Sequence, residues 1–297
     1  MEKFKSGFVA IVGRTNVGKS TILNDMVGQK IAVVVNKPQT TRTAIKAIVN
    51  RENSQIIFTD TPGIHKPKNK LGEKMSETIA DATEGVDIML YLIEATDKGI
   101  GMANEFILNK IKESKAKAIL AINKADLVKK ENLLPLIDAY SKKYDFEAII
   151  PISAREDDGI DILLKKIVEI LPEGPVYYSD EEWTDQTERQ IVEETIREKA
   201  LKCLDDEIPH GICVEVTSMK MREDKELYDI EATIYCEKKS HKGIIIGKDG
   251  SVLKLIGERA REDIEKMLDC HVNLQLWVKV KEGWRDDEKK LNQIFKA

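Results

Sequence analysis

The eight residues from Gly13 to Ser20 have the composition and spacing of a phosphate-binding loop. They read Gly-Arg-Thr-Asn-Val-Gly-Lys-Ser, follow an apolar run expected to be a strand, and open an expected helix. Glycine lets backbone N–H groups close around phosphate oxygens, and the helix N-terminus adds partial positive charge. Lys19 is expected to reach the β and γ phosphates of a nucleotide. The predicted phosphate-binding residues are Gly13, Arg14, Thr15, Asn16, Val17, Gly18, Lys19, Ser20 and Thr21.

A second segment is suited to selecting the base. Residues 123–126, Asn-Lys-Ala-Asp, follow another expected strand and should lie at the carboxyl edge of the sheet, where nucleotides bind. The carboxylate of Asp126 can accept hydrogen bonds from guanine N1–H and from the 2-amino group, neither of which adenine offers. Asn123 can bridge loops, and the stem of Lys124 can cover the base. The predicted base-binding residues are Asn123, Lys124, Asp126, Ser153 and Ala154.

Two further loops provide candidate ligands for Mg²⁺. Asp60, in Asp-Thr-Pro-Gly, is placed to hold the ion's hydration shell, and Gly63 can offer its N–H to the γ phosphate. Thr40 and Thr41 lie in a loop before a strand, and one of them should reach the metal; the sequence does not say which. The expected magnesium ligands are Ser20, Asp60 and Thr40 or Thr41. The expected catalytic residues are Lys19, Thr40, Thr41 and Gly63, and the nucleotide-binding set also includes Asp60, Thr61, Pro62 and Gly63.

The residue after Gly63 bears on the rate of hydrolysis. Many GTPases have a glutamine there that orients the attacking water, whereas this chain has Ile64, followed by His65. Isoleucine cannot polarise water, so hydrolysis must rely on another group, on the backbone or on a partner, and a slow intrinsic rate is expected. His65 is a weaker candidate for the base, because an exposed histidine in a loop is the commoner case.

The elements that must position these residues alternate over the first 170 residues. Short apolar runs are separated by helical patterns such as the one from Ile160 to Leu171, which keeps one face apolar. This alternation predicts an α/β fold with a doubly wound, mostly parallel sheet. Farther along, the order becomes helix, strand, strand, helix, helix, strand, which predicts a smaller α+β domain. We place the first domain at residues 1–172, a linker at 173–182 and the second domain at 183–297.

Composition narrows the class of protein. The 297 residues are 42% apolar, which is enough for sizeable cores, and the net charge of −5 argues mildly against a nucleic-acid-binding protein. No apolar run is long enough to span a bilayer, and the N-terminus does not resemble a secretory signal. The four cysteines lie far apart without a C-x-x-C pair, which is typical of a reduced cytoplasm and makes a zinc site unlikely to form.

Together the motifs resemble the Era family of bacterial GTPases. The segments GRTNVGKS, KPQTTR, DTPGIH, NKAD and SA occur in that order, followed by KKSHKGIIIGKDGSVLKLIGERAR and LWVKVKEGW, so that the resemblance covers essentially the whole chain. It implies a Ras-like P-loop GTPase domain joined to a type II KH domain. It also implies binding to the 3′ region of small-subunit (16S) ribosomal RNA and a role in maturation of the small ribosomal subunit.

The motifs, the resemblance and the composition together give the expected ligands and location. GTP, GDP and Mg²⁺ are the expected ligands. In related GTPases with isoleucine or leucine after the D-x-x-G glycine, K⁺ can assist hydrolysis through a phosphate-loop asparagine, which would be Asn16 here. We expect a monomer in the cytoplasm, with peripheral association at the inner face of the cell membrane as an open option.

The loop of residues 247–250, Gly-Lys-Asp-Gly, joins two expected short helices. Loops of the form G-x-x-G clamp about four nucleotides in KH domains, although most such loops taken alone are simple turns. Residues 238–261 hold seven basic and two acidic residues, so the acidic chain has a local basic region. Trp277 and Trp284 could stack on bases, but Trp277 lies in an alternating strand pattern and is expected in the core. The predicted RNA-binding residues are Lys242, Gly243, Ile244, Ile246, Gly247, Lys248, Asp249, Gly250 and Lys254.

Two other functions stay open beside the leading one, a GTP-hydrolysing switch that binds ribosomal RNA. Ile64 is compatible with a nucleotide-dependent but essentially non-catalytic RNA-binding assembly factor. A GTPase of tRNA modification shares switch motifs like KPQTTR, but it would need a catalytic extension with a reactive C-terminal cysteine, which the sequence does not show.

Overall fold

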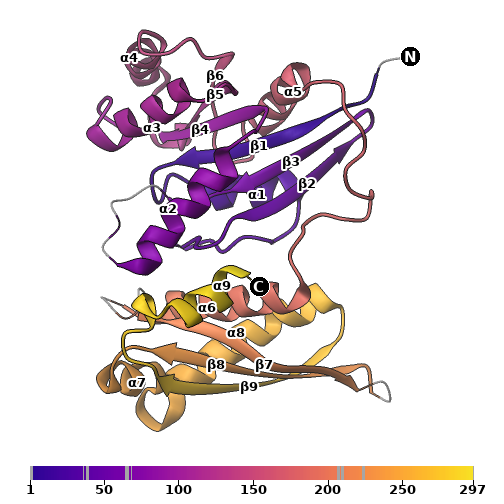
Figure 1. The fold of residues 1–297 in the computed structure, drawn as a ribbon, viewed down its shortest axis with the longest axis vertical. Helices are drawn as coiled ribbons and strands as arrows, with labels where there is room; N and C mark the ends of the chain where they lie inside the picture. The colour runs from indigo at the N-terminus through magenta and orange to yellow at the C-terminus, as the bar shows by residue number, and fades with distance from the viewer. Residues whose placement is uncertain are drawn as a thin grey trace. The chain divides into compact units, whose positions relative to one another are not determined.

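The computed structural model describes residues 3–35, 37, 40–63, 67, 69–205, 208, 211–222 and 225–296 (Figure 1). The chain divides into two compact units, which are described separately. Unit 1 comprises residues 1–32, 38–68 and 72–185, and unit 2 comprises residues 33–37, 69–71 and 186–297. Among the described residues, no helix combines the length and the apolarity needed to cross a bilayer.

Unit 1 is built on a six-stranded sheet with the strand order β2-β3-β1-β4-β5-β6. Strand β2 runs antiparallel to β3, and the other neighbours are parallel. Since β1 lies between β3 and β4, the chain order reverses at β1, and ligands of such sheets bind at the carboxyl ends of the strands there. The strands are β1 (Lys5–Gly13), β2 (Ile45–Arg51), β3 (Ser54–Asp60), β4 (Ile88–Glu94), β5 (Lys117–Asn123) and β6 (Ala148–Pro151).

Helices cover both faces of this sheet because its central strands are apolar on both sides. In β4, Leu90 and Leu92 pack with α1 and α5, whereas Tyr91 and Ile93 pack with α3 and α4. The expected apolar stripe that starts at Ile160 lies on α5 and is buried, as predicted. Each large aliphatic side chain buried in this way contributes about 1.5–3 kcal/mol. The helices are α1 (Lys19–Val27), α2 (Lys70–Thr83), α3 (Met102–Glu113), η1 (Ala125–Leu127), α4 (Lys130–Ser141) and α5 (Ile160–Ile170).

The segment of residues 172–185, which we call the strap, belongs to unit 1 and includes the whole of the expected linker, residues 173–182. The buried amide of Gln55 accepts hydrogen bonds from the backbone N–H groups of Tyr177 and Tyr178 at 2.8 and 3.0 Å and donates to the carbonyl of Tyr178 at 2.8 Å. Farther along, the carbonyl of Trp183 accepts from Ile48 N in β2 at 3.0 Å. The strap is therefore hydrogen-bonded along unit 1 as far as the boundary between residues 185 and 186.

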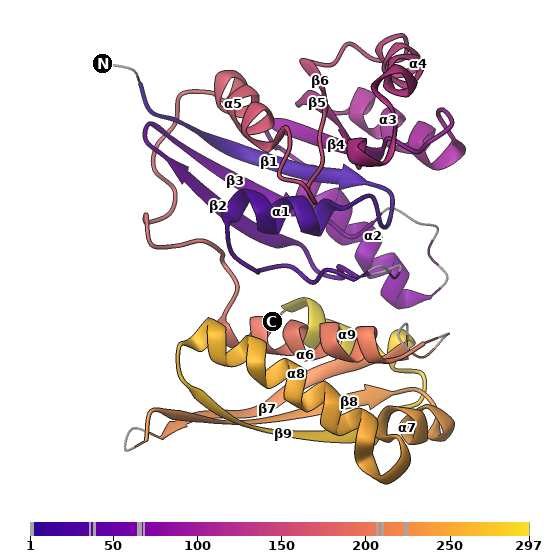
Figure 2. The same cartoon turned by 180° about the vertical axis from the view of Figure 1, so that it is seen from behind.

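Unit 2 has the expected order of helix, strand, strand, helix, helix, strand. Its sheet has the order β7-β8-β9, with β7 antiparallel and β9 parallel to β8. Helices α6 and α8 lie side by side over this sheet, and their apolar faces form one core with it (Figure 2). The elements are α6 (Glu188–Cys203), β7 (Cys213–Arg222), β8 (Leu227–Cys236), α7 (Lys239–Ile246), η3 (Lys248–Gly250), α8 (Ser251–Leu268), β9 (His271–Val280), η4 (Trp284–Asp286) and α9 (Glu288–Lys296).

The replacement Gln55→Ala should loosen the strap. It leaves the backbone N–H groups of Tyr177 and Tyr178, which are partly buried in these hydrogen bonds, without their acceptor, so we expect the free energy of unfolding to fall by about 1–3 kcal/mol. Urea unfolding measures this loss, and chymotrypsin should cleave faster after Tyr177. Asn109→Ala, an exposed amide on α3, is the control. Cleavage at the wild-type rate in Gln55→Ala would contradict the assigned role of Gln55.

Candidate functional site

The predicted phosphate loop connects β1 to α1 and adopts a conformation that needs glycine. Gly18 caps the N-terminus of α1 with φ of 99°, in the left-handed region. A Cβ atom on Gly18 would lie 2.3 Å from the side-chain nitrogen of Asn123, so no larger residue fits without displacing that amide. Asn16 also has a positive φ, of 65°. The loop is therefore shaped partly by its own backbone and partly by a residue more than 100 positions away.

Lys19 is the first residue of α1, and its side chain is buried against the preceding phosphate loop. Its side-chain nitrogen donates to the carbonyls of Gly13 at 3.3 Å and Arg14 at 3.0 Å. Burial lowers the pKa of the Lys19 ammonium, and the carboxylate of Asp60 opposes this shift. A buried cation at a helix N-terminus can compensate the charge of a bound phosphate.

Side-chain oxygens from α1, from the end of β3 and from the loop before β2 meet beside Lys19. The hydroxyl of Ser20 donates to Asp60 Oδ2 at 2.7 Å, Thr41 donates to the same oxygen at 3.1 Å, and the two hydroxyls lie 3.1 Å apart. Thr40 is half-buried beside Thr41 in the sequence. The structure thus brings Thr41 together with Ser20 and Asp60, so Thr41 is the threonine of the two that we expect to reach the metal.

The donor atoms of this cluster fit Mg²⁺. Asp60 is fully buried, and its Oδ1 has no hydrogen-bond partner among the described residues. Burial raises the pKa of the Asp60 carboxyl, while Lys19, Ser20 and Thr41 act in the opposite direction. A hard cation with oxygen ligands would stabilise the ionised carboxylate and satisfy the buried oxygen. Ser20, Thr41 and Asp60 are the residues that could hold it.

The predicted base-binding segment is organised by Asn123. Its Oδ1 accepts from Lys124 N at 2.8 Å and Ala154 N at 3.2 Å, and its Nδ2 donates to the carbonyl of Val17 at 2.8 Å. The Ser153 hydroxyl donates to Asp126 Oδ1 at 2.6 Å. Because each carboxylate oxygen can accept more than one hydrogen bond, Asp126 can still bind two guanine N–H groups.

The segment after β3 lies against the phosphate loop. Thr61 is fully buried and donates to the carbonyl of Ile11 at 2.8 Å. A Cβ atom on Gly63 would lie 2.5 Å from Thr15 Cγ2 and 3.0 Å from Thr15 N, so this position requires glycine. Pro62, between them, is buried. Ile64 and His65, on which the expected hydrolysis rate depends, lie outside the described residues.

Three acidic or amide residues at this site were missed by the sequence reasoning. The guanidinium of Arg14 pairs with Asp97 at 2.6 Å, and the side-chain amide of Asn104 donates to the second oxygen of Asp97 at 3.2 Å. The ammonium of Lys124 pairs with Glu94 and donates to the carbonyl of Asn16 at 3.1 Å. The available signal was the position of Glu94 at the end of a buried strand and of Asp97 three residues later, at the same carboxyl end of the sheet as the motifs.

Unit 2 contains the predicted G-x-x-G loop between α7 and α8. Gly247, Asp249 and Gly250 all have positive φ, of 74°, 52° and 78°, and a Cβ on Gly247 would lie 2.6 Å from Val252 Cγ2. Helix α8 has no acidic residue in its first turn, so its N-terminus keeps a positive partial charge toward the loop. The loop can therefore approach a phosphate backbone closely.

The side chains around this loop divide into exposed and packed groups. Ile244 is 52% exposed, whereas Ile246 is half-buried and packs against the core of the unit. Lys248 and Lys254 are exposed, and Lys242 is half-buried. Lys254 forms a 3.9 Å ion pair with Glu258. The predicted RNA-binding residues Lys242, Gly243, Ile244, Ile246, Gly247, Lys248, Asp249, Gly250 and Lys254 thus lie on α7, the loop and the first turn of α8.

The prediction that Trp277 lies in the core is wrong. Leu276 and Val278 pack toward α8, so the alternation of β9 places Trp277 on the other face of the sheet, where it is 54% exposed. Trp284 is fully buried, and its indole N–H donates to the carbonyl of Gly211 at 2.9 Å, so it cannot stack on a base.

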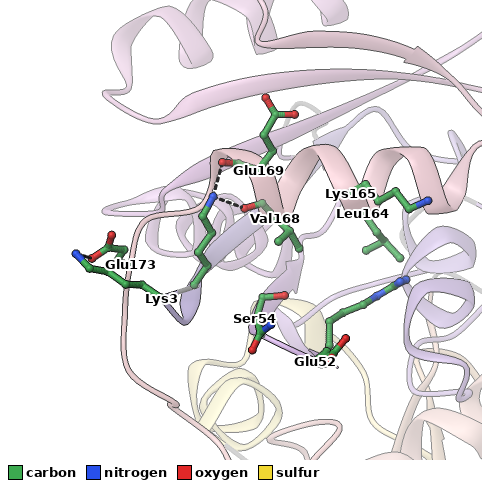
Figure 3. A pocket seen from close by; sticks show the side chains of 11 residues that line it. Lys3, Glu52, Ser54, Leu164, Lys165, Val168, Glu169 and Glu173 are labelled. Carbon is green, nitrogen blue, oxygen red and sulfur yellow. Dashed lines mark hydrogen bonds and ion pairs between the residues drawn. The ribbon is translucent and has the colours of Figure 1, made fainter. Parts of the chain in front are cut away.

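Two cavities of unit 1 lie outside the phosphate loop. One, of about 630 Å³, lies beside the base-binding segment and is lined by residues that include Asp126 and Ser153. The other, of about 580 Å³, lies where β1 and β3 begin, with Leu164 and Val168 of α5 facing Ser54 and Glu52 (Figure 3). Lys5, in this second cavity, donates to the carbonyls of Val168 and Glu169, so its ammonium caps the C-terminus of α5. The predicted nucleotide residues are all at the opposite edge of the sheet.

Known proteins resemble this chain in both units. A family model described as a 50S ribosome-binding GTPase matches residues 8–124, and a KH domain model matches residues 207–285. GTPase Era of Ruminiclostridium cellulolyticum is 53% identical over 98% of this chain and 97% of that protein. GTPase Era of Caldicellulosiruptor saccharolyticus is 55% identical over 96% of this chain and 95% of that protein.

Two solved structures match both units. A crystal structure of Era in complex with MgGDPNP and nucleotides 1506–1542 of 16S ribosomal RNA has a TM-score of 0.94 and 39% identity, and it covers 98% of each chain. A variant of Aquifex aeolicus Era bound to GDP·AlF4⁻ has a TM-score of 0.94 and 38% identity, with 98% of this chain and 99% of that one covered.

The contacts of Ser20, Thr41 and Asp60 predict that Thr41, and not Thr40, contributes to Mg²⁺ binding. Thr41→Ala removes a hydroxyl that contacts Asp60, so the Mg²⁺ concentration needed to bind a GTP analogue should rise, and turnover should fall at least about tenfold, or about 1.4 kcal/mol of barrier. Titration of Mg²⁺ against GDPNP binding and a phosphate-release assay measure both effects. Thr41→Ser should recover most of the loss. A larger effect from Thr40→Ala than from Thr41→Ala would refute the assignment.

Proposed function

Because this chain belongs to the GTPase Era family, we propose that it is a GTP-hydrolysing switch that binds the 3′ region of 16S ribosomal RNA and assists maturation of the small ribosomal subunit. One observation carries the proposal: a guanine-nucleotide site in unit 1 and a KH-type G-x-x-G loop in unit 2 occur in a chain that matches an RNA-bound Era structure over 98% of its length. The nucleotide site supports the switch, and the loop supports the RNA.

The residues of unit 1 suggest how GTP would be held. Lys19 would contact the β and γ phosphates, and Mg²⁺ would be held by Ser20, Thr41 and, through water, Asp60. When bound, the metal would neutralise charge that develops on the phosphates. Thr41 and Gly63 come from the two loops that would border the γ phosphate, so loss of that phosphate on hydrolysis would remove the contacts that hold both loops.

The residues of unit 2 suggest how RNA would be held. The backbone of the G-x-x-G loop and the N-terminus of α8 would bind the phosphate backbone of the RNA. Lys248 and Lys254 would supply exposed positive charges beside it. Ile244, which is half exposed on α7, offers an apolar contact for a base. A short basic groove of this kind is enough for single-stranded RNA even in a chain whose net charge is −5.

The proposal extends to the cellular setting. The small ribosomal subunit is the assembly that carries the RNA, so it is the expected partner of a monomer in the cytoplasm. Any association with the inner face of the cell membrane would be peripheral, because no described helix has the length and apolarity needed to cross a bilayer.

A switch requires that RNA binding depend on the nucleotide. We expect an RNA oligonucleotide of the 16S 3′ region to bind at least about fivefold more tightly in the GDPNP state than in the GDP state, a coupling typical of allosteric proteins. Fluorescence anisotropy measures both affinities. Lys248→Glu should weaken RNA binding in both states, while Lys220→Glu, an exposed lysine on β7, is the charge-matched control.

The anisotropy measurement, crosslinking of bound cellular RNA and a phosphate-release assay have three distinct outcomes. Equal RNA affinity with GDP and GDPNP would refute the switch. Crosslinked cellular RNA that is not from the small subunit would refute the RNA partner even if GTP is hydrolysed. Nucleotide-dependent RNA binding with no phosphate release, alone or with RNA, would favour the non-catalytic assembly factor that Ile64 allows.

Potassium is a further part of the proposal and concerns Asn16. Isoleucine after Gly63 cannot orient water, so a cation near the phosphate loop would compensate for the missing glutamine. We expect hydrolysis by the isolated protein to be well below 1 s⁻¹ and to rise when K⁺ replaces Na⁺. Asn16→Ala should remove the K⁺ stimulation, and GDP affinity measured in parallel shows whether the loop, which has φ of 65° at this position, still binds nucleotide. Stimulation that persists in Asn16→Ala would contradict this role.

A further inference from the structure

The ammonium of Lys124 is held by two groups from different elements. It forms an ion pair with Glu94, the last residue of β4, and donates to the carbonyl of Asn16 in the phosphate loop at 3.1 Å. A lysine side chain has four rotatable bonds, and it loses much of that freedom when its end is fixed. Two anchors therefore determine where the stem of Lys124 lies.

Glu94 is positioned by the sheet and not by the lysine. It lies opposite Asn123 in the register of β4 and β5, and the following residue, Ala95, donates its N–H to the carbonyl of Asn123 at 2.8 Å. The hydroxyl of Thr96 lies 3.4 Å from the second carboxylate oxygen of Glu94. The same strand end thus fixes the carboxylate and the start of the base-binding segment relative to each other.

Burial separates this pair from the ordinary surface ion pairs of the chain. The side chains of Lys124 and Glu94 are 33% and 20% exposed, whereas those of Lys143 and Glu105, which lie 3.9 Å apart, are 51% and 57% exposed. Exposed pairs contribute little because water and salt screen them. The pair of Lys124 and Glu94 is partly shielded from water, and the same ammonium also donates to the Asn16 carbonyl. These two contacts can therefore hold the Lys124 side chain in one position.

We propose that Glu94 is a positioning residue for guanine recognition. By binding the ammonium of Lys124 together with the Asn16 carbonyl, Glu94 holds the lysine stem across the place of the base before the nucleotide arrives. Affinity rises because the side-chain freedom of Lys124 has already been lost in the folded protein. This inference rests on the proposed guanine-nucleotide site and adds to it a residue outside all of the sequence motifs.

The test is the neutral replacement Glu94→Gln, which keeps the size of the side chain. We expect affinity for GDP and for GDPNP to fall by the same factor, about three- to tenfold, because the two ligands share the base. In turnover, the loss should fall on KM and not on kcat. Calorimetric titration of the full chain measures the affinities. Inorganic tripolyphosphate, which has no base, should bind Glu94→Gln and the wild type equally.

A second variant tests whether Glu94 acts through the lysine. Lys124→Met keeps an apolar stem without the ammonium, so Glu94→Gln added to it should cause no further loss. Glu105→Gln is the matched control at an exposed pair. Wild-type affinity in Glu94→Gln, additive losses in the double variant, or an equal loss for tripolyphosphate would each overturn the inference. Failure of the wild type to prefer guanine over adenine nucleotides would overturn the proposed function instead.

Discussion

The nucleotide site depends on one buried side-chain amide, that of Asn123. It is 3% exposed and forms hydrogen bonds to the carbonyl of Val17 and to the backbone N–H groups of Lys124 and Ala154. The bond to Val17 is buried and the other two are partly buried, so breaking them leaves polar groups with little access to water. The phosphate loop, the base-binding segment and the loop after β6 therefore share one fixed point. The absence of a Cβ atom on Gly18 is what allows the amide to occupy that point.

The site also buries a cation and an anion that the fold alone does not fully compensate. Burial lowers the pKa of Lys19 and raises that of Asp60, although each moderates the shift of the other. Charges shifted in this direction cost free energy in the folded protein and are typical of functional sites. A phosphate beside Lys19 and a cation beside Asp60 would both favour the charged forms. Ligand binding is thus expected to stabilise unit 1 by offsetting the cost of these two buried charges.

Motifs made of consecutive residues could be located from the sequence alone. Contacts between residues that lie far apart in the sequence could not. The phosphate loop, the base-binding segment and the order of elements in both units are local patterns, and the comparisons confirm the fold that they predict. Glu94 reaches Lys124 through the register of β4 with β5, and Asp97, beyond the end of β4, pairs with Arg14 of the phosphate loop; periodicity specifies neither contact. Thr41 and Thr40 are chemically identical, so only the geometry of the loop separates them. Trp277 was placed wrongly because alternation predicts two faces without saying which one the helices cover.

The strap has a consequence for how molecules of this protein behave toward one another. Strand β2 is at the edge of the six-stranded sheet, and an uncovered edge offers backbone groups to any other extended chain. The bridge between Ala47 and Thr184, and the hydrogen bond from Ile48 to Trp183, occupy backbone groups on that edge. The connection that leads out of unit 1 thereby also protects it from self-association. Mutations that release the strap should raise the tendency to aggregate before they affect nucleotide binding.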